Sequence, residues 1–128
     1  MATALPRPGL TAYYDSLQLP FSDLVSQLVN SIGRKLTAYV AGVKDVRAID
    51  RWQQGGEPYG DVEPRLRFTF RVVRTLQEHD SPRVVKAWLT SVNPELGDRT
   101  PIRVLREGDL DSVAVEVLGA ARAFIAGG

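Results

Sequence analysis

Two adjoining stretches, GRKLTAYVAGV (residues 33–43) and VRAIDRWQQG (residues 46–55), decide the fold expected for this chain. The first carries small apolar residues at helical spacing and reaches a bend at Gly42, because glycine commonly ends helices. In the second, Ile49 and Trp52 recur at a spacing of three, which would return a second helix to the same core. Two short helices joined by a glycine-containing turn are the pattern of a helix-turn-helix.

The helix-turn-helix interpretation leaves three basic side chains, Lys44, Arg47 and Arg51, facing outward. A recognition helix presents such side chains to the major groove of DNA. Against DNA binding, Asp45 and Asp50 fall on the same predicted helix, where they would repel phosphates, and the turn needs one residue more than the usual motif. An ordinary three-helix core explains the apolar spacing as well, so both interpretations stay open at this point.

The composition and net charge of the chain limit the classes of function that it can have. With 128 residues, 44% of them hydrophobic, the chain is long enough for one globular domain or two small helical lobes that share a core. The net charge is only +1, so DNA binding would need a local basic patch or several copies of the chain. Cysteine is absent, no apolar run approaches the ~20 residues of a membrane span, and residues 1–10 do not resemble an export signal. We therefore expect a cytoplasmic protein without membrane attachment.

Apolar residues at three- and four-residue spacing predict further helices on both sides of the central unit. Ser22 is the expected N-cap of the helix before Gly33, and Ser81 with Pro82 is expected to begin another helix. The predicted helices span residues 21–32, 61–77, 82–91, 102–106 and 111–125. No segment alternates apolar and polar residues for long enough to predict a strand, so the expected fold is all-α. We expect three parts: an N-terminal arm (residues 1–20) with a short helix at 13–17, a helix-turn-helix domain (21–78) and a helical C-terminal half (79–128).

The sequence does not combine its reactive residues into a catalytic pattern. The one histidine, His79, falls in a predicted turn with no acid–base partner motif. Asp109 and Asp111 precede an apolar periodic run, where aspartate most often caps a helix. The glycine pair at 55–56 lacks the strand-loop-helix context of a phosphate loop, and no residue cluster has metal-ligand spacing. We expect a binding protein rather than an enzyme, without metal or cofactor.

Three arginines, Arg67, Arg71 and Arg74, form a row on the helix predicted at residues 61–77. A row of this kind is most often a solvated helix face. It is also suited to contact a DNA backbone or an acidic partner. The spacing alone does not decide between these alternatives.

The most distinctive segment is the loop NPELGDRTP (residues 93–101), which follows an aromatic residue, Trp88. Its Asn-Pro start favours a turn, Gly97 permits a left-handed backbone, and Pro101 suits the first position of the next helix. A rigid loop between short helices suits the docking of a partner protein. A well-capped connection without any partner would show the same pattern.

This segment resembles a known family. The residues that carry the resemblance are Trp88-Leu89, Asn93-Pro94-Glu95-Leu96-Gly97, Thr100-Pro101, Leu105 and Gly108. They are similar to the toxin-binding domain of Xre/MbcA/ParS-type antitoxins. Residues 42–55 look like the Xre helix-turn-helix of the same proteins, so the resemblance covers roughly residues 21–125.

The resemblance implies a bacterial type II toxin–antitoxin pair. The toxin of such a pair carries a RES domain that degrades NAD⁺, and the antitoxin blocks access to that active site through its C-terminal region. Antitoxins of this family usually form homodimers and, bound to toxin, repress their own operon by binding operator DNA. Carried over by position, the toxin-binding surface would lie at residues 93–101 and along the final helix, with Asn93, Leu96, Arg99, Arg122 and Phe124 as its site residues.

Two other functions remain open from the sequence. One is a stand-alone helix-turn-helix transcriptional regulator with no toxin partner. The other is an interaction adaptor whose helix-turn-helix does not bind DNA. An affinity for operator DNA that falls steeply with salt would mark a DNA reader, whereas co-purification with a RES-domain protein would mark an antitoxin.

Overall fold

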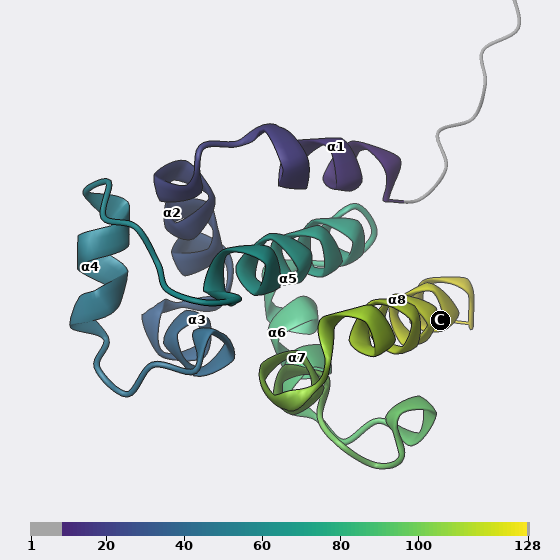
Figure 1. The fold of residues 1–128 in the computed structure, drawn as a ribbon. Coiled ribbons are helices and arrows are strands. Elements are labelled where there is room, and N and C mark those ends of the chain that lie inside the picture. The colour runs from purple at the N-terminus through teal and green to yellow at the C-terminus, as the bar shows by residue number, and fades with distance from the viewer. Residues whose placement is uncertain (1–8, 128) are drawn as a thin grey trace, which may run out of the picture.

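The computed structural model describes residues 9–127, and over this range the chain is helical (Figure 1). The described residues form no strand beyond one isolated antiparallel bridge, between Asn93 and Arg99. The elements are α1 (Leu10–Gln18), α2 (Phe21–Ile32), α3 (Arg34–Ala41), α4 (Arg47–Gln53), α5 (Val62–Gln77), α6 (Pro82–Thr90), the 3₁₀ helix η1 (Pro94–Leu96), α7 (Pro101–Glu107) and α8 (Leu110–Gly127). The all-α prediction is confirmed. Within residues 9–127, no helix is both long enough and apolar enough to cross a bilayer.

The 16-residue helix α5 lies at the centre of the molecule, and α1, α2, α3 and α8 pack against it (Figure 1). Its buried face includes Leu66, Phe70 and Leu76, which recur at helical spacing and are at most 1% exposed. A single hydrophobic cluster extends from Leu24 in α2 to Ala121 in α8. The segments at 21–78 and 79–128 therefore share one core.

Local residue chemistry accounts for most helix boundaries. α2 has the predicted bounds and ends at Gly33. The prediction that Ser22 caps this helix is wrong, because the helix begins one residue earlier and Ser22 lies within its first turn. At the start of α6, the Ser81 hydroxyl accepts a hydrogen bond from the Val84 N–H at 3.3 Å, and Pro82 occupies the first helical position, as predicted.

A buried arginine ties α5 to the turn between α7 and α8. Arg65 is 8% exposed, and its Nη1 donates hydrogen bonds to the main-chain oxygens of Leu105 (2.6 Å) and Gly108 (2.9 Å). Its Nη2 pairs with the Asp61 carboxylate at 2.6 Å. Carbonyls at the end of a helix have no partner inside the helix. Arg65 satisfies those at the end of α7 and so fixes where α8 begins.

The N-terminal residues, predicted to form an arm, differ most from the prediction. Residues 1–8 of that predicted arm lie outside the described residues. Residues 10–18 form α1, which is longer than the helix expected at 13–17 and runs along α5 (Figure 1). α1 joins α2 through two extended residues, Leu19 and Pro20.

Candidate functional site

The loop at residues 93–101 is held by its own hydrogen bonds. The Asn93 side chain accepts from the Glu95 N–H (2.9 Å), and the Asn93 carbonyl accepts from the N–H groups of Leu96 (2.9 Å) and Asp98 (3.0 Å). The Asn93 N–H donates to the carbonyl of Arg99 at 3.0 Å, which closes the loop at its base. These hydrogen bonds order the loop and close it on itself.

Two consecutive residues of this loop have left-handed backbones. Gly97 has φ 65°, as its residue type predicts, and Asp98 has φ 61°, which is uncommon for a residue other than glycine. Thr100 then caps α7 by accepting from the Arg103 N–H at 3.3 Å, with Pro101 at the first helical position. The tight reversal presents the start of the loop toward the end of α8.

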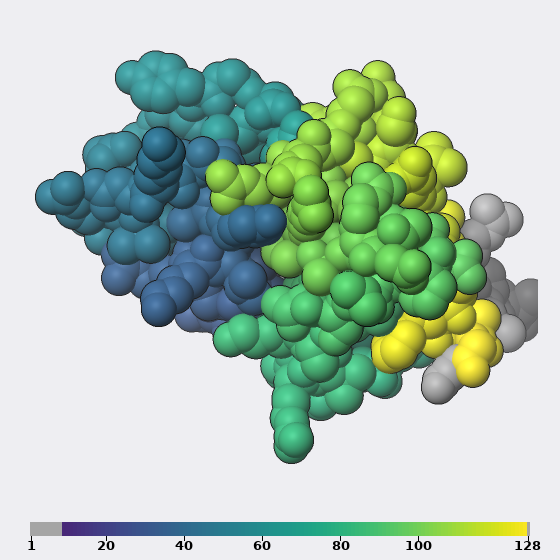
Figure 2. Space-filling view, turned by 90° about the horizontal axis from the view of Figure 1, so that it is seen from below, coloured from purple at the N-terminus to yellow at the C-terminus, as the bar shows by residue number. Residues whose placement is uncertain are grey.

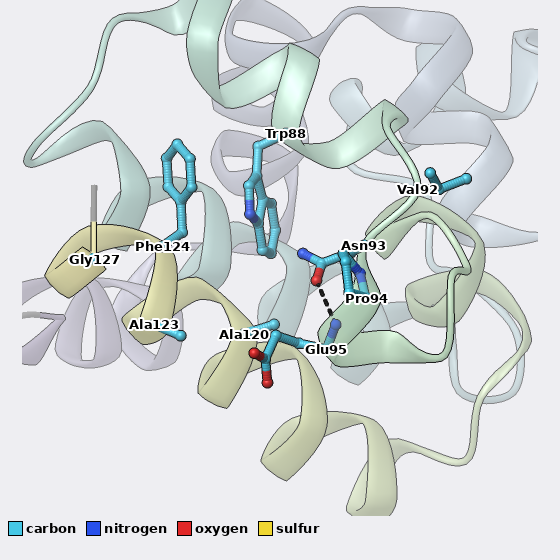
Figure 3. Close-up of a pocket in the computed structure, with 9 residues that line it drawn as sticks. All are labelled: Trp88, Val92, Asn93, Pro94, Glu95, Ala120, Ala123, Phe124 and Gly127. Atoms are coloured by element: carbon cyan, nitrogen blue, oxygen red, sulfur yellow. Dashed lines mark hydrogen bonds between the residues drawn. The ribbon is translucent and has the colours of Figure 1, made fainter.

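A groove of about 410 Å³ opens between the end of α6, η1 and the end of α8 (Figure 3). The rings of Trp88 and Phe124 lie 6.2 Å apart at its apolar side. The Asn93 side chain and the Glu95 carboxylate lie at its polar side (Figure 3). The groove is lined by Trp88, Val92, Asn93, Pro94, Glu95, Ala120, Ala123, Phe124 and Gly127. Concave apolar surfaces with a few placed polar groups are the usual form of a binding site.

The structure places the five predicted toxin-binding residues in different environments. Asn93 and Phe124 line the groove. Arg99 stands outside it, where it donates to the Leu96 carbonyl at 2.8 Å and pairs with Glu116 of α8 at 3.5 Å. Leu96 itself is 1% exposed, so it supports the loop from below and offers no surface to a partner.

Arg122 lies on a different face of α8 from the groove. Ala120, Ala123 and Phe124 cluster on one side of the helix, and a helical period of 3.6 residues turns Arg122 away from them. Arg122 instead lies near Arg71 of α5, whose pKa is lowered by burial and by this neighbouring charge. Arg122 is therefore separated from the other predicted toxin-binding residues.

Several groove residues were not singled out as site residues from the sequence. Trp88 and Val92 lie before the predicted surface at residues 93–101, and Glu95 lies within it but is not among the five predicted site residues. The small residues Ala120 and Ala123 leave the space into which the groove opens (Figure 3). Their three-residue spacing on the final helix is the signal that could have located them.

The predicted DNA-binding residues lie on and beside α4. Lys44, Arg47 and Arg51 are exposed, but Lys44 lies in the connection between α3 and α4. The connection spans residues 42–46, longer than the roughly three or four residues of the usual motif. Gly42 has φ 77° and forms the bend, as predicted.

Both acidic residues of this surface are neutralised by arginines. Asp45 lies in the connection, and the prediction that it belongs to the second helix is wrong, because α4 begins only at Arg47. Its carboxylate accepts hydrogen bonds from Arg47, which hold the pKa of Asp45 below its ordinary value. Asp50 lies on α4, and both of its carboxylate oxygens accept hydrogen bonds from Nη2 of Arg34, at 2.9 and 2.8 Å. The expected repulsion of phosphates is reduced by this pairing.

The arginine row of α5 is not an open face, because α1 lies along it; Arg67 and Arg71 are partly buried and Arg74 is exposed. Arg67 donates to main-chain oxygens of α1 and its following turn, and Arg74 pairs with Asp15 at 3.6 Å. Arg71 stacks on the ring of Tyr13, with the guanidinium carbon 4.6 Å from the ring centre. The arginine row is therefore the surface of α5 on which α1 packs.

The residues considered for catalysis take structural or exposed positions. His79 is exposed in the turn after α5. Asp109 accepts from the Ser112 N–H at 3.4 Å and caps α8, as predicted. Within residues 9–127, no three His, Cys, Asp or Glu side chains gather where they could hold a metal ion.

No protein-family model, curated protein or solved structure matches this chain.

Proposed function

We propose that this chain is an antitoxin that occludes the active site of a RES-domain, NAD⁺-degrading toxin, and that the groove between α6, η1 and α8 is its toxin-binding surface. The main structural support for this proposal is the groove. One side of it is formed by residues of the segment 88–97, whose sequence resembles the toxin-binding domain of Xre/MbcA/ParS-type antitoxins, and the other side by the end of α8. Two of the five residues that the resemblance implies, Asn93 and Phe124, line this groove.

Occlusion requires a surface rather than reacting groups. A stable inhibitory interface buries about 1,200–2,000 Å² in total, and a few central aromatic residues supply most of its affinity. Phe124, which is partly buried against Trp88, provides such an anchor, and Val92, which is 68% exposed, extends the apolar surface. Trp88 is only 8% exposed and supports the floor of the groove from the core. Asn93 and Glu95 supply a polar rim that orients the partner. The loop is already ordered by its internal bonds, so binding costs it little conformational freedom.

In the same proposal α3, the connection and α4 act as a helix-turn-helix that holds operator DNA in a homodimer. Residues 34–51 carry five basic and two acidic side chains, a net charge of +3, whereas the whole chain carries +1. Lys44, Arg47 and Arg51 would contact bases or phosphates, and a two-fold dimer would double this charge over a palindromic site. α3 and α4 lie at one end of the face in Figure 2 and the end of α8 at the other, so DNA and toxin would not compete for space.

Co-expression with the protein encoded beside this gene, which the proposal predicts to carry a RES domain, tests the proposal. The toxin alone should deplete cytoplasmic NAD⁺ and arrest growth. Addition of this chain should restore both, and the two proteins should co-purify. The proposal fails if the neighbouring protein is harmless alone, or if the pair does not co-purify.

A stand-alone transcriptional regulator is the second candidate. The basic surface of α3 and α4 favours this candidate, because its two acidic side chains, Asp45 and Asp50, are each paired with an arginine. Such a regulator would bind operator DNA at full affinity without a partner protein, and its affinity would fall steeply with salt.

A further inference from the structure

α1 packs with its more apolar face toward solvent. Leu10, Tyr13, Tyr14 and Leu17 recur at helical spacing and are between 38% and 59% exposed. The residues of α1 that are fully buried against α5 are small, Ala12 and Ser16, and Tyr13 at the edge of this face stacks on Arg71 while staying 38% exposed. A surface helix normally turns its larger apolar residues toward the core. Burial of apolar surface therefore contributes little to holding α1 in place.

Polar contacts with the arginine row of α5 hold α1 instead. Arg67 donates to the carbonyls of Ser16 (3.0 Å) and Leu19 (2.8 Å). The Asp15–Arg74 pair is long, at 3.6 Å, and both side chains are about two-fifths exposed (39% and 43%). Exposed ion pairs of this kind are weak and are screened by salt. The carbonyl and carboxylate oxygens that hold α1 on the arginines can thus be replaced by the oxygens of an anion.

Arg71 is poorly accommodated beneath α1. Its Nε is buried and finds no hydrogen-bond partner among residues 9–127. Burial, and then the nearby charge of Arg122, lower the pKa of Arg71, while Tyr13 acts in the opposite direction. A buried donor without a partner costs free energy, which is recovered when the donor is exposed to water or to an acceptor.

We propose that α1 is a displaceable cover, and that Arg67, Arg71 and Arg74 beneath it form a second contact surface for the phosphate backbone of duplex DNA. At 1.5 Å per residue, the row extends over about 10 Å, which corresponds to roughly three phosphates along one strand. Guanidinium groups match phosphate oxygens well, and these oxygens would replace the carbonyl and carboxylate oxygens that α1 now offers. The extended residues Leu19 and Pro20 serve as the hinge. This surface is separate from α4 and does not depend on the antitoxin role.

A disulfide that fixes α1 on α5 tests the proposal in the full-length chain, which has no cysteine of its own. A Cβ built on Gly9 lies 3.6 Å from Cβ of Thr75, within the usual separation for a disulfide of about 3.5–4.5 Å. In oxidised Gly9→Cys/Thr75→Cys, α1 is held at its N-terminal end by the bridge and at its C-terminal end by α2. Fluorescence anisotropy with a random 20-bp duplex, across a salt series, then measures DNA affinity.

We expect the reduced double variant to bind DNA at least ~10-fold more tightly than the oxidised one. The plot of log affinity against log salt should be steeper by about 2–3 in the reduced form, since each phosphate contact adds about 0.9 to the slope. Gly9→Cys alone, treated with the same oxidant, controls for strain at this residue, whose φ is +83°. Replacement of all three arginines by glutamine (Arg67→Gln, Arg71→Gln and Arg74→Gln) in the double variant should remove the difference between the two redox forms.

A second variant tests the release of α1 without a crosslink. Ala12→Phe overfills the closely packed space beneath α1 without adding a charge, and should raise DNA affinity above that of the wild type. Substitution of Arg47 and Arg51 by glutamine should weaken operator recognition yet leave the redox effect intact, which separates this surface from α4. Equal affinity of the oxidised and reduced forms would overturn the proposal, as would binding of a poly-glutamate peptide in place of DNA.

Discussion

Replacement of Arg65 by methionine should destabilise the fold more than any surface substitution. The side chain makes two hydrogen bonds to main-chain carbonyls at the end of α7 and one ion pair with Asp61, and it is only 10% exposed. Methionine fills a similar volume but leaves the carbonyls of Leu105 and Gly108 without this donor. Hydrogen bonds to charged groups contribute about 1.5–3 kcal/mol each, and a buried polar group left unpaired costs about 1–3 kcal/mol.

The expected loss is about 3–4 kcal/mol in the free energy of unfolding, measured by urea titration with an unchanged m-value. For a chain of this length, an unfolding entropy of roughly 2.1 cal/mol/K per residue converts that loss into a fall in Tm of about 11–15 °C. Arg103→Met is the matched control, because its pair with Glu107 is exposed on both sides (58% and 56%). That variant should unfold at nearly the same urea concentration as the wild type, since an exposed ion pair contributes little to stability. If the free energy of unfolding of Arg65→Met stays within about 1 kcal/mol of the wild type, Arg65 does not hold the turn between α7 and α8 to α5.

Three further outcomes follow from single contacts. Gly108→Ala should cost about 2–3 kcal/mol in urea titrations, because the added Cβ would lie 2.0 Å from a methyl carbon of Val113, and Val113→Ala should recover part of that loss. Thr100→Ala removes the cap of α7 and should lower stability by about 1 kcal/mol, seen as a small fall in Tm. Arg47→Gln should raise the pKa of Asp45 toward its ordinary value in an NMR titration, since hydrogen bonds from Arg47 lower it. The lowered pKa means that this pair stabilises the fold at neutral pH and that its contribution is lost as the pH falls through the folded-state pKa of Asp45.

Features set by neighbouring residues were predictable from the sequence. Pro82 after Ser81, and Pro101 after Thr100, signal helix starts through local geometry and capping alone, and the structure has helices starting at both prolines. Gly97 was predicted to adopt a left-handed backbone for the same reason. The extent of α2 followed from the spacing of its apolar residues.

Features set by contacts between distant segments were not predictable in this way. The arginine row looked like a solvated or ligand-binding face because its partner, α1, lies about 50 residues earlier in the chain. The groove depends on how the end of α8 meets the end of α6, which no local pattern encodes. Leu96 was predicted as a surface contact from its motif position, but the turn around it directs the side chain into the core.

One substitution at the edge of the groove between α6, η1 and α8 tests the proposal that this groove binds the toxin. Ala123 is exposed and lines the groove, so Ala123→Arg should fill it without disturbing the core. Val115 lies on the same helix, is 77% exposed and is not part of the groove, so Val115→Arg is the matched control. The measurement is the affinity of each variant for the purified RES-domain protein, together with inhibition of its NAD⁺ consumption.

Ala123→Arg should lower the affinity for the toxin by about 100-fold or more, equivalent to about 2.7 kcal/mol, and the toxin should then consume NAD⁺ in its presence. Val115→Arg should bind and inhibit as the wild type does. Wild-type affinity in Ala123→Arg, or an equal loss in both variants, would contradict the assignment of the groove.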